Sequence, residues 1–172
     1  MIIQELTTAE YNPFYGKYLD LIPKDTELLS AYEQNTKDII DFFSSISQEK
    51  LEYRYQPEKW TIKQIFQHII DNERIFSIRL LRVARKDKTA LPGYDEQLFA
   101  NNCESNSKTI DELLEEFKIT RTLTLSIVNS LSDSQLANMG TISNSDMSAR
   151  ACAFLNIAHS MWHMNTIKER YL

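Results

Sequence analysis

Four long segments of the chain carry apolar residues at spacings of three and four, the periodicity of an amphipathic helix. They are expected at about residues 25–47, 61–86, 109–131 and 146–171. Glycine, which strands and tight turns use freely, occurs only 3 times in 172 residues. The pattern therefore predicts an all-α protein, and four long helices in one chain predict a four-helix bundle.

The clearest helix start lies at Thr61. Its hydroxyl can accept from the backbone amide of Gln64 while the Gln64 side chain reaches back, which is a capping box. Further start signals are Thr7 with Glu10 for a short first helix, Asp25 or Thr26 for the first long helix, Thr109 with Glu112 for the third long helix and Ser132 with Gln135 for a single turn.

The connections between the helices also constrain the topology. Residues 87–107 form a link of about twenty residues, which is long for a hairpin between antiparallel neighbours. Such a link can return the chain along the bundle, so that the second and third long helices run parallel. A polar stretch at 138–145 leads to the last helix. No linker or repeat divides the chain, so residues 1–172 are expected to form a single domain.

The charge balance argues against partners with phosphate backbones. The net charge is −5 and the pI is near 5.3, which opposes attraction to nucleic acid or anionic lipid. One group of cations falls near the end of the second helix, where cations complement the helix dipole, and is expected to be solvated. The group comprises Arg79, Arg82, Arg85, Lys86 and Lys88. The sequence therefore predicts no nucleic-acid partner.

The contexts of the two cysteines indicate a reducing environment. Cys103 lies in a polar loop and Cys152 in an apolar helix, so no disulfide is expected, and cytoplasmic localisation fits best. Residues 1–10 show no signal peptide. Residues 151–167 lack formal charge, but they are too short and too polar for a membrane span.

All three histidines fall inside two of the predicted helices. His159 and His163 are four residues apart, so their side chains leave the same helix face close enough to reach one ion. His68 in the second helix can supply a third imidazole, beside Asn72. Core histidines bonded to neighbouring carbonyls are an equal alternative at this point, because a single pair at this spacing is a weak signal.

Other polar residues surround this candidate site. Asn156 and Thr166 share the face of the histidine pair and, with Asn72, are candidate pocket residues. Cys152 lies about 10 Å from His159 along the axis, too far for direct activation, and is expected to be a small core residue. Asp71 and Glu73, near His68 in the sequence, are expected to be solvated.

Three segments together resemble the DinB-like superfamily. These are residues 59–65 leading to His68, the pair His159 and His163 followed by 169–171, and the loop 91–96. The superfamily includes metal-dependent bacillithiol S-transferases and mycothiol-dependent maleylpyruvate isomerases. The resemblance covers nearly the whole chain.

The resemblance implies an up-down-down-up bundle, often a homodimer, with a divalent ion held by His68, His159 and His163. Nickel or zinc is expected. Many relatives have a further histidine next to the last ligand, where this chain has Trp162 and Met164, so no fourth ligand or base is expected there. The implied activity is thiol transfer to, or hydrolysis of, a small-molecule electrophile.

The nucleophile implied by the resemblance is a metal-bound water or thiolate. If it is a thiolate, a low-molecular-weight thiol is the expected cosubstrate. The alternative is a non-catalytic metal-binding bundle with a structural, stress-response or sensing role. A third reading, a DNA binder, is disfavoured by the acidic net charge.

Overall fold

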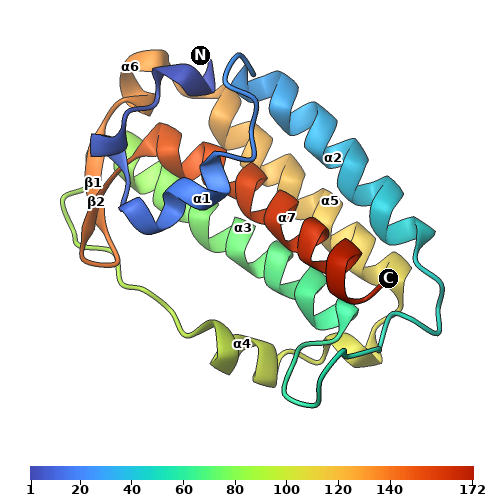
Figure 1. Cartoon of the computed structure of the whole chain (residues 1–172). Coiled ribbons are helices and arrows are strands. Elements are labelled where there is room, and N and C mark those ends of the chain that lie inside the picture. Colours follow the sequence, from blue (N-terminus) through green and yellow to red (C-terminus); the bar gives the residue numbers. More distant parts are fainter.

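Four long helices lie side by side in the computed structural model, which describes residues 1–172 (Figure 1). They are α2 (Leu28–Ser45), α3 (Ile62–Ala84), α5 (Ile110–Asn129) and α7 (Ala149–Arg170). Helices α2 and α7 run in one direction, whereas α3 and α5 run in the other. The predicted all-α, up-down-down-up four-helix bundle is confirmed, and α3 packs against both α5 and α7.

Shorter elements cover the ends and one side of the bundle. They are the 3-10 turns η1 (Ile3–Glu5), η2 (Thr8–Glu10), η3 (Pro13–Tyr15) and η4 (Ser105–Ser107), the helices α1 (Gly16–Leu19), α4 (Glu96–Asn102) and α6 (Asp133–Leu136), and the strands β1 (Met139–Ile142) and β2 (Ser145–Ser148).

The predicted capping boxes form at Thr7, Thr61, Thr109 and Ser132. The start of the first long helix was placed too early, because α2 begins at Leu28 after Glu27, and neither Asp25 nor Thr26 caps it. Each box links residues three apart, so it depends little on tertiary contacts. This explains why these starts were the most predictable part of the fold.

A β-hairpin replaces the expected polar stretch before the last helix. Strands β1 and β2 pair antiparallel, and the two residues between them, Ser143 and Asn144, have positive φ angles of 50° and 63°. Such a turn usually contains glycine, and this one contains none, so no turn motif in the sequence predicts the hairpin. Because residues 145–148 form β2, α7 begins at Ala149 and not at Asp146, with Ser148 as its cap.

The long crossover between α3 and α5 contains helix α4, which was not predicted. Asp95 caps α4 by accepting from the amide of Leu98. Two side chains at the start of α3 hold the helix in place: Trp60 Nε1 donates to Gln97 at 3.2 Å, and Gln64 Nε2 donates to the carbonyl of Ala100 at 3.1 Å. Helix α4 therefore lies beside the first turns of α3, on one flank of the bundle (Figure 1).

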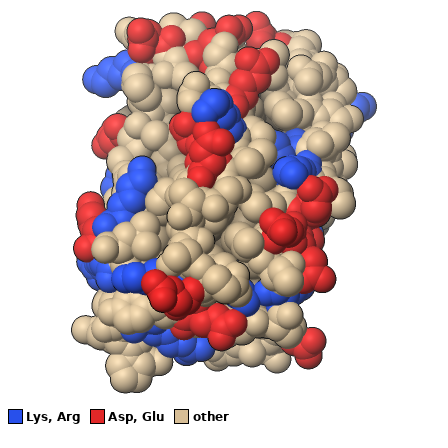
Figure 2. All heavy atoms as spheres, turned by 90° about the vertical axis from the view of Figure 1, so that its right-hand side faces the viewer, with Lys and Arg blue, Asp and Glu red and all other residues tan.

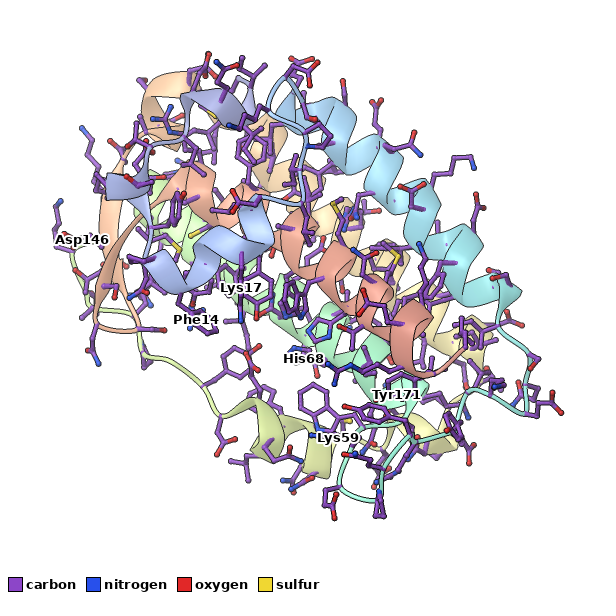
Figure 3. The ribbon with its side chains drawn as sticks, in the orientation of Figure 1. Phe14, Lys17, Lys59, His68, Asp146 and Tyr171 are labelled. Atoms are coloured by element: carbon purple, nitrogen blue, oxygen red, sulfur yellow. The ribbon has the colours of Figure 1, made fainter.

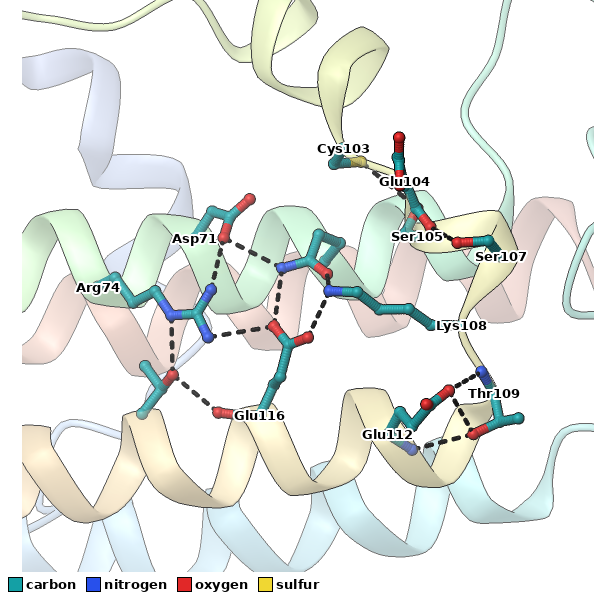
Figure 4. A network of polar contacts seen from close by, with 12 residues as sticks. Asp71, Arg74, Cys103, Glu104, Ser105, Ser107, Lys108, Thr109, Glu112 and Glu116 are labelled. Carbon is teal, nitrogen blue, oxygen red and sulfur yellow. Dashed lines mark hydrogen bonds and ion pairs between the residues drawn. The ribbon is translucent and has the colours of Figure 1, made fainter.

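The core consists of two apolar clusters, to which the four long helices contribute most residues and the N-terminal segment and the hairpin contribute some. A bidentate ion pair joins α3 and α5 within this interior: Arg121 Nε and Nη2 donate to Glu73 at 2.7 and 2.9 Å. Glu73 is only 1% exposed, so the expectation that it would be solvated is wrong. A second, partly exposed network joins the same helices: Arg74 bridges Asp71 and Glu116, and Lys108 also contacts Glu116 (Figure 4).

Both cysteines are free, and burial raises the pKa of the Cys152 thiol to about 12, as suits a core residue. None of the helices combines the length and apolar character needed to cross a membrane. On the face drawn in Figure 2, acidic and basic side chains are interspersed, and neither sign forms a continuous field.

Candidate metal centre

The three histidines meet between α3 and α7. Nε2 of His159 lies 3.0 Å from Nε2 of His68 and 3.1 Å from Nε2 of His163. One ligand atom from each ring falls within 4.8 Å of the others. His159 and His163 are one turn apart on α7, whereas His68 comes from the second turn of α3, so the Thr61 cap that starts α3 also positions His68.

The surroundings keep all three imidazoles uncharged near neutral pH. Burial lowers the pKa of His68 to about 4 and that of His163 to about 3. Burial also holds the pKa of His159 well below its usual range, and the two neighbouring histidines lower it further. Neutral imidazole is the form that binds metal ions, so no proton has to be removed before binding at pH 7.

The donor set fits a divalent ion. Three imidazole nitrogens that all lie within 4.8 Å of one another are a donor set of the kind that holds zinc and similar divalent ions in proteins. The Nε2 atom of His159 faces two other ring nitrogens at once, and a single proton on it cannot satisfy both contacts fully. A cation among the three lone pairs would satisfy all of them.

Aromatic rings enclose the histidine cluster. The ring of Trp60 lies 4.8 Å from that of His68, and the ring of Tyr18 lies 6.1 Å from that of His159 and 5.0 Å from that of Trp162. In Figure 3, His68 is seen between Phe14 and Lys17 on one side and Lys59 and Tyr171 on the other. The N-terminal segment and the helix ends thus form two walls around the site.

Two cavities adjoin the cluster from different sides. The first has a volume of about 110 Å³, and His159 forms part of its wall together with Asn72 and Tyr94. The second has a volume of about 250 Å³ and is lined by His163 and Thr166. A molecule in either cavity would therefore contact a histidine of the cluster.

The predicted pocket residues separate into two groups. Asn72 lines the first cavity, where its Oδ1 accepts from the Tyr94 hydroxyl at 3.0 Å, and Thr166 lines the second. Asn156 lines neither cavity. It is buried between α7 and α2, where its Nδ2 lies 3.4 Å from the Tyr32 hydroxyl and its Oδ1 has no hydrogen-bond partner.

Arg79 belongs to the site, contrary to the expectation that it would be solvated with the other cations near the end of α3. It is only 5% exposed and lines the first cavity. A signal was present in the sequence: Asn72, Phe76 and Arg79 are spaced by four and three residues, so they share one face of α3. All three line the same cavity.

Comparisons with known proteins agree with this architecture. The family model described as the DinB superfamily matches residues 31–167, which include all three histidines. Among solved structures, YfiT from Bacillus subtilis is similar, with a TM-score of 0.75 and 17% sequence identity over 98% of this chain and 95% of the YfiT chain. YfiT is described as a probable metal-dependent hydrolase with an unusual four-helix bundle topology.

At 17% identity, the likeness to YfiT shows a shared fold. No match was found among the curated proteins. The family model covers most of the chain, from the first turns of α2 to the last turn of α7. On this match, the chain belongs to the DinB superfamily.

Proposed function

We propose that this chain is a divalent-metal-dependent enzyme that acts on a small-molecule electrophile, with His68, His159 and His163 as the metal ligands. The observation that carries the proposal is the convergence of the three ring nitrogens beside a cavity. The three ligands are neutral, so a divalent ion held by them would keep its full positive charge. When bound, it would favour the deprotonated form of water or of a thiol.

The chain's own residues would prepare this site in two ways. The buried imidazoles need no proton release before binding, and the rings of Trp60 and Tyr18 restrict water around them. Imidazole ligands suit zinc, nickel and copper alike, and we propose zinc or nickel as the resident metal. The small cavities fit a small molecule and not a macromolecule.

Two features bear on the type of reaction. The likeness to YfiT, described as a probable hydrolase, supports hydrolysis. The separate cavities against His159 and His163 support transfer of a thiol, because two reactants could approach the cluster from different sides. We therefore propose hydrolysis or thiol transfer, with a low-molecular-weight thiol as cosubstrate in the second case.

The decisive experiment compares metal-free protein with protein reloaded with zinc or nickel. Each form is assayed against aryl esters for hydrolysis, and against a chlorinated aromatic electrophile with bacillithiol, mycothiol, glutathione or coenzyme A for transfer. The proposal expects turnover that depends on metal and is lost in His159→Ala but retained in Cys103→Ser, a matched control outside both cavities.

Absence of turnover in every metal-loaded assay, together with loss of the fold on chelation, would contradict the proposal and favour a structural metal site. Circular dichroism before and after chelation measures whether the fold is lost.

That the chain forms a homodimer stays a prediction, and sedimentation velocity tests it.

A further inference from the structure

Two arginines are buried inside this bundle, and they differ in the counter-charge and the hydrogen-bond acceptors that surround them. Arg121 is 1% exposed, and its guanidinium donates to both carboxylate oxygens of Glu73, to Asn35 at 3.0 Å and to Thr36 at 2.8 Å. A buried charge is costly unless it is paired and hydrogen-bonded. Arg121 meets both conditions within the protein.

Arg79 does not. Its Nη2 donates to the carbonyl of Pro92 at 2.8 Å, and its guanidinium lies 4.8 Å from the Phe76 ring and 5.9 Å from the Tyr94 ring. No Asp or Glu oxygen lies within 4.0 Å of it, since Arg79 takes part in none of the nine ion pairs. Its Nε and Nη1 have no acceptor in the protein.

The free N–H groups of Arg79 are accessible. The only side-chain nitrogen or oxygen atoms sealed from solvent without a partner are Nδ2 of Asn35 and Oδ1 of Asn156. Arg79 forms part of the wall of the cavity of about 110 Å³ that His159 also lines. The unpartnered donors of a nearly buried cation are therefore available to a molecule in that cavity.

We infer that this cavity binds the carboxylate of a small molecule through the guanidinium of Arg79. A guanidinium offers two parallel N–H groups that match the two oxygens of a carboxylate. Phe76, Tyr15 and Leu155 supply an apolar wall for the rest of the molecule. The inference gives the substrate class for the function proposed above, and it rests on that function only for the reaction at the histidine end.

The neighbouring charge favours a monoanion. Glu96 also lines the cavity but takes part in none of the nine ion pairs. A carboxylate adds one negative charge beside Glu96, whereas a phosphate monoester adds nearly two and is repelled more strongly. We therefore expect an aromatic or apolar carboxylate to bind better than the matching phosphate, and the matching neutral amide to bind least.

The test measures binding to metal-free protein, so that the ligand cannot coordinate an ion. Benzoate, phenyl phosphate and benzamide are titrated by isothermal calorimetry into the wild type, Arg79→Gln and Arg85→Gln. Arg85 ends the same helix and is exposed, so its variant is the matched control. We expect benzoate to bind the wild type and the control equally and Arg79→Gln about ten- to a hundredfold more weakly.

A second measurement needs no variant. In the wild type, the Nε–H signal of Arg79 should shift in a nitrogen–proton correlation spectrum during the benzoate titration, and benzamide should leave it unmoved. The inference is overturned if benzoate does not bind saturably, if Arg79→Gln binds it as well as the control, or if phenyl phosphate binds more tightly. It is also overturned if the Arg79 signal stays fixed at saturation.

These results separate the inference from the proposed function. Carboxylate binding that persists in His159→Ala, in a protein that shows no metal-dependent turnover, would uphold the anion site and reject the enzyme. Metal-dependent turnover, together with benzoate binding that does not depend on Arg79, would uphold the enzyme and reject the anion site.

Discussion

Nε2 of His68 lies 3.0 Å from Nε2 of His159, although the two residues are 91 positions apart in the chain. The contact joins α3 to α7, and α3 packs against α5 as well as α7. The long crossover lets α3 and α5 run in the same direction. It also supplies Tyr94 and Glu96 to the adjoining cavity.

Tyr94 tethers this crossover to the bundle through its hydrogen bond to Asn72. Tyr94→Phe removes the bond but keeps the ring, so segment 95–102 should open more easily. A hydrogen bond contributes about 1 kcal/mol, which predicts about fivefold faster amide exchange in that segment by mass spectrometry. Tyr53→Phe, at an exposed position, is the control. Unchanged exchange in both variants would show that the tether does not hold the crossover.

The buried pair of Glu73 and Arg121 should dominate the polar contribution to stability. Glu73→Gln leaves the Arg121 cation without its counter-charge, so the free energy of unfolding should fall by about 3–5 kcal/mol in urea titrations. Asp41→Asn, which breaks an exposed pair with Lys37, should change it by less than about 1 kcal/mol. Equal effects of the two substitutions would show that the buried pair contributes no more to stability than the exposed pair.

Glu10 and Arg150 link the N-terminal segment to the start of α7 and predict a pH dependence. Burial alone would raise the pKa of Glu10, but hydrogen bonds from Arg150, Thr7 and Ser148 outweigh it and lower the pKa to about 2. A carboxyl whose pKa is lowered on folding stabilises the fold above its unfolded pKa, near 4.5. That contribution is lost as the pH falls from about 4.5 to about 2.

Glu10→Gln should therefore lower stability at pH 7 and flatten the acid side of the stability curve. Glu5→Gln, at an exposed position in the same segment, should leave the curve unchanged. The measurement is the midpoint of thermal unfolding between pH 2 and pH 7. An identical acid slope in the wild type and Glu10→Gln would refute the assignment.

Gly140 of the hairpin packs tightly against Val83 of α3. A Cβ atom added there would lie 2.8 Å from Cγ2 of Val83, so Gly140→Ala should lower the free energy of unfolding by about 1–3 kcal/mol. Most of this loss should disappear when Val83 is itself replaced by Ala, as a double-mutant cycle would show. Gly16→Ala is the control, because its nearest contact is 4.0 Å away. Additive effects of the two substitutions would mean that no clash exists.

The sequence predicted most where contacts are local. The capping box of Thr61 depends on residues three apart, and the spacing of His159 and His163 follows from the helix itself. Partners across the bundle were not predictable in the same way. Whether Glu73 faces solvent or Arg121 depends on the rotation of α3 about its own axis relative to α5. The periodicity of apolar residues defines that rotation only to within the width of the apolar stripe.

Irregular structure was also missed for a physical reason. The hairpin turn at Ser143 and Asn144 has two residues with positive φ but no glycine, and helix α4 is short and shows exposed apolar side chains such as Leu98. Arg79 was misplaced because a cation near the end of a helix is usually solvated. The crossover contributes to its burial, because the Pro92 carbonyl accepts from its Nη2.

We expect His68, His159 and His163 together to hold one divalent ion. The most direct measurement is the metal content of protein purified without an affinity tag, determined by mass spectrometry after gel filtration. We predict about one zinc or nickel ion per chain in the wild type and in Cys103→Ser, and loss of that ion in His159→Ala with the fold retained. A metal content in His159→Ala equal to that of the wild type would contradict this expectation.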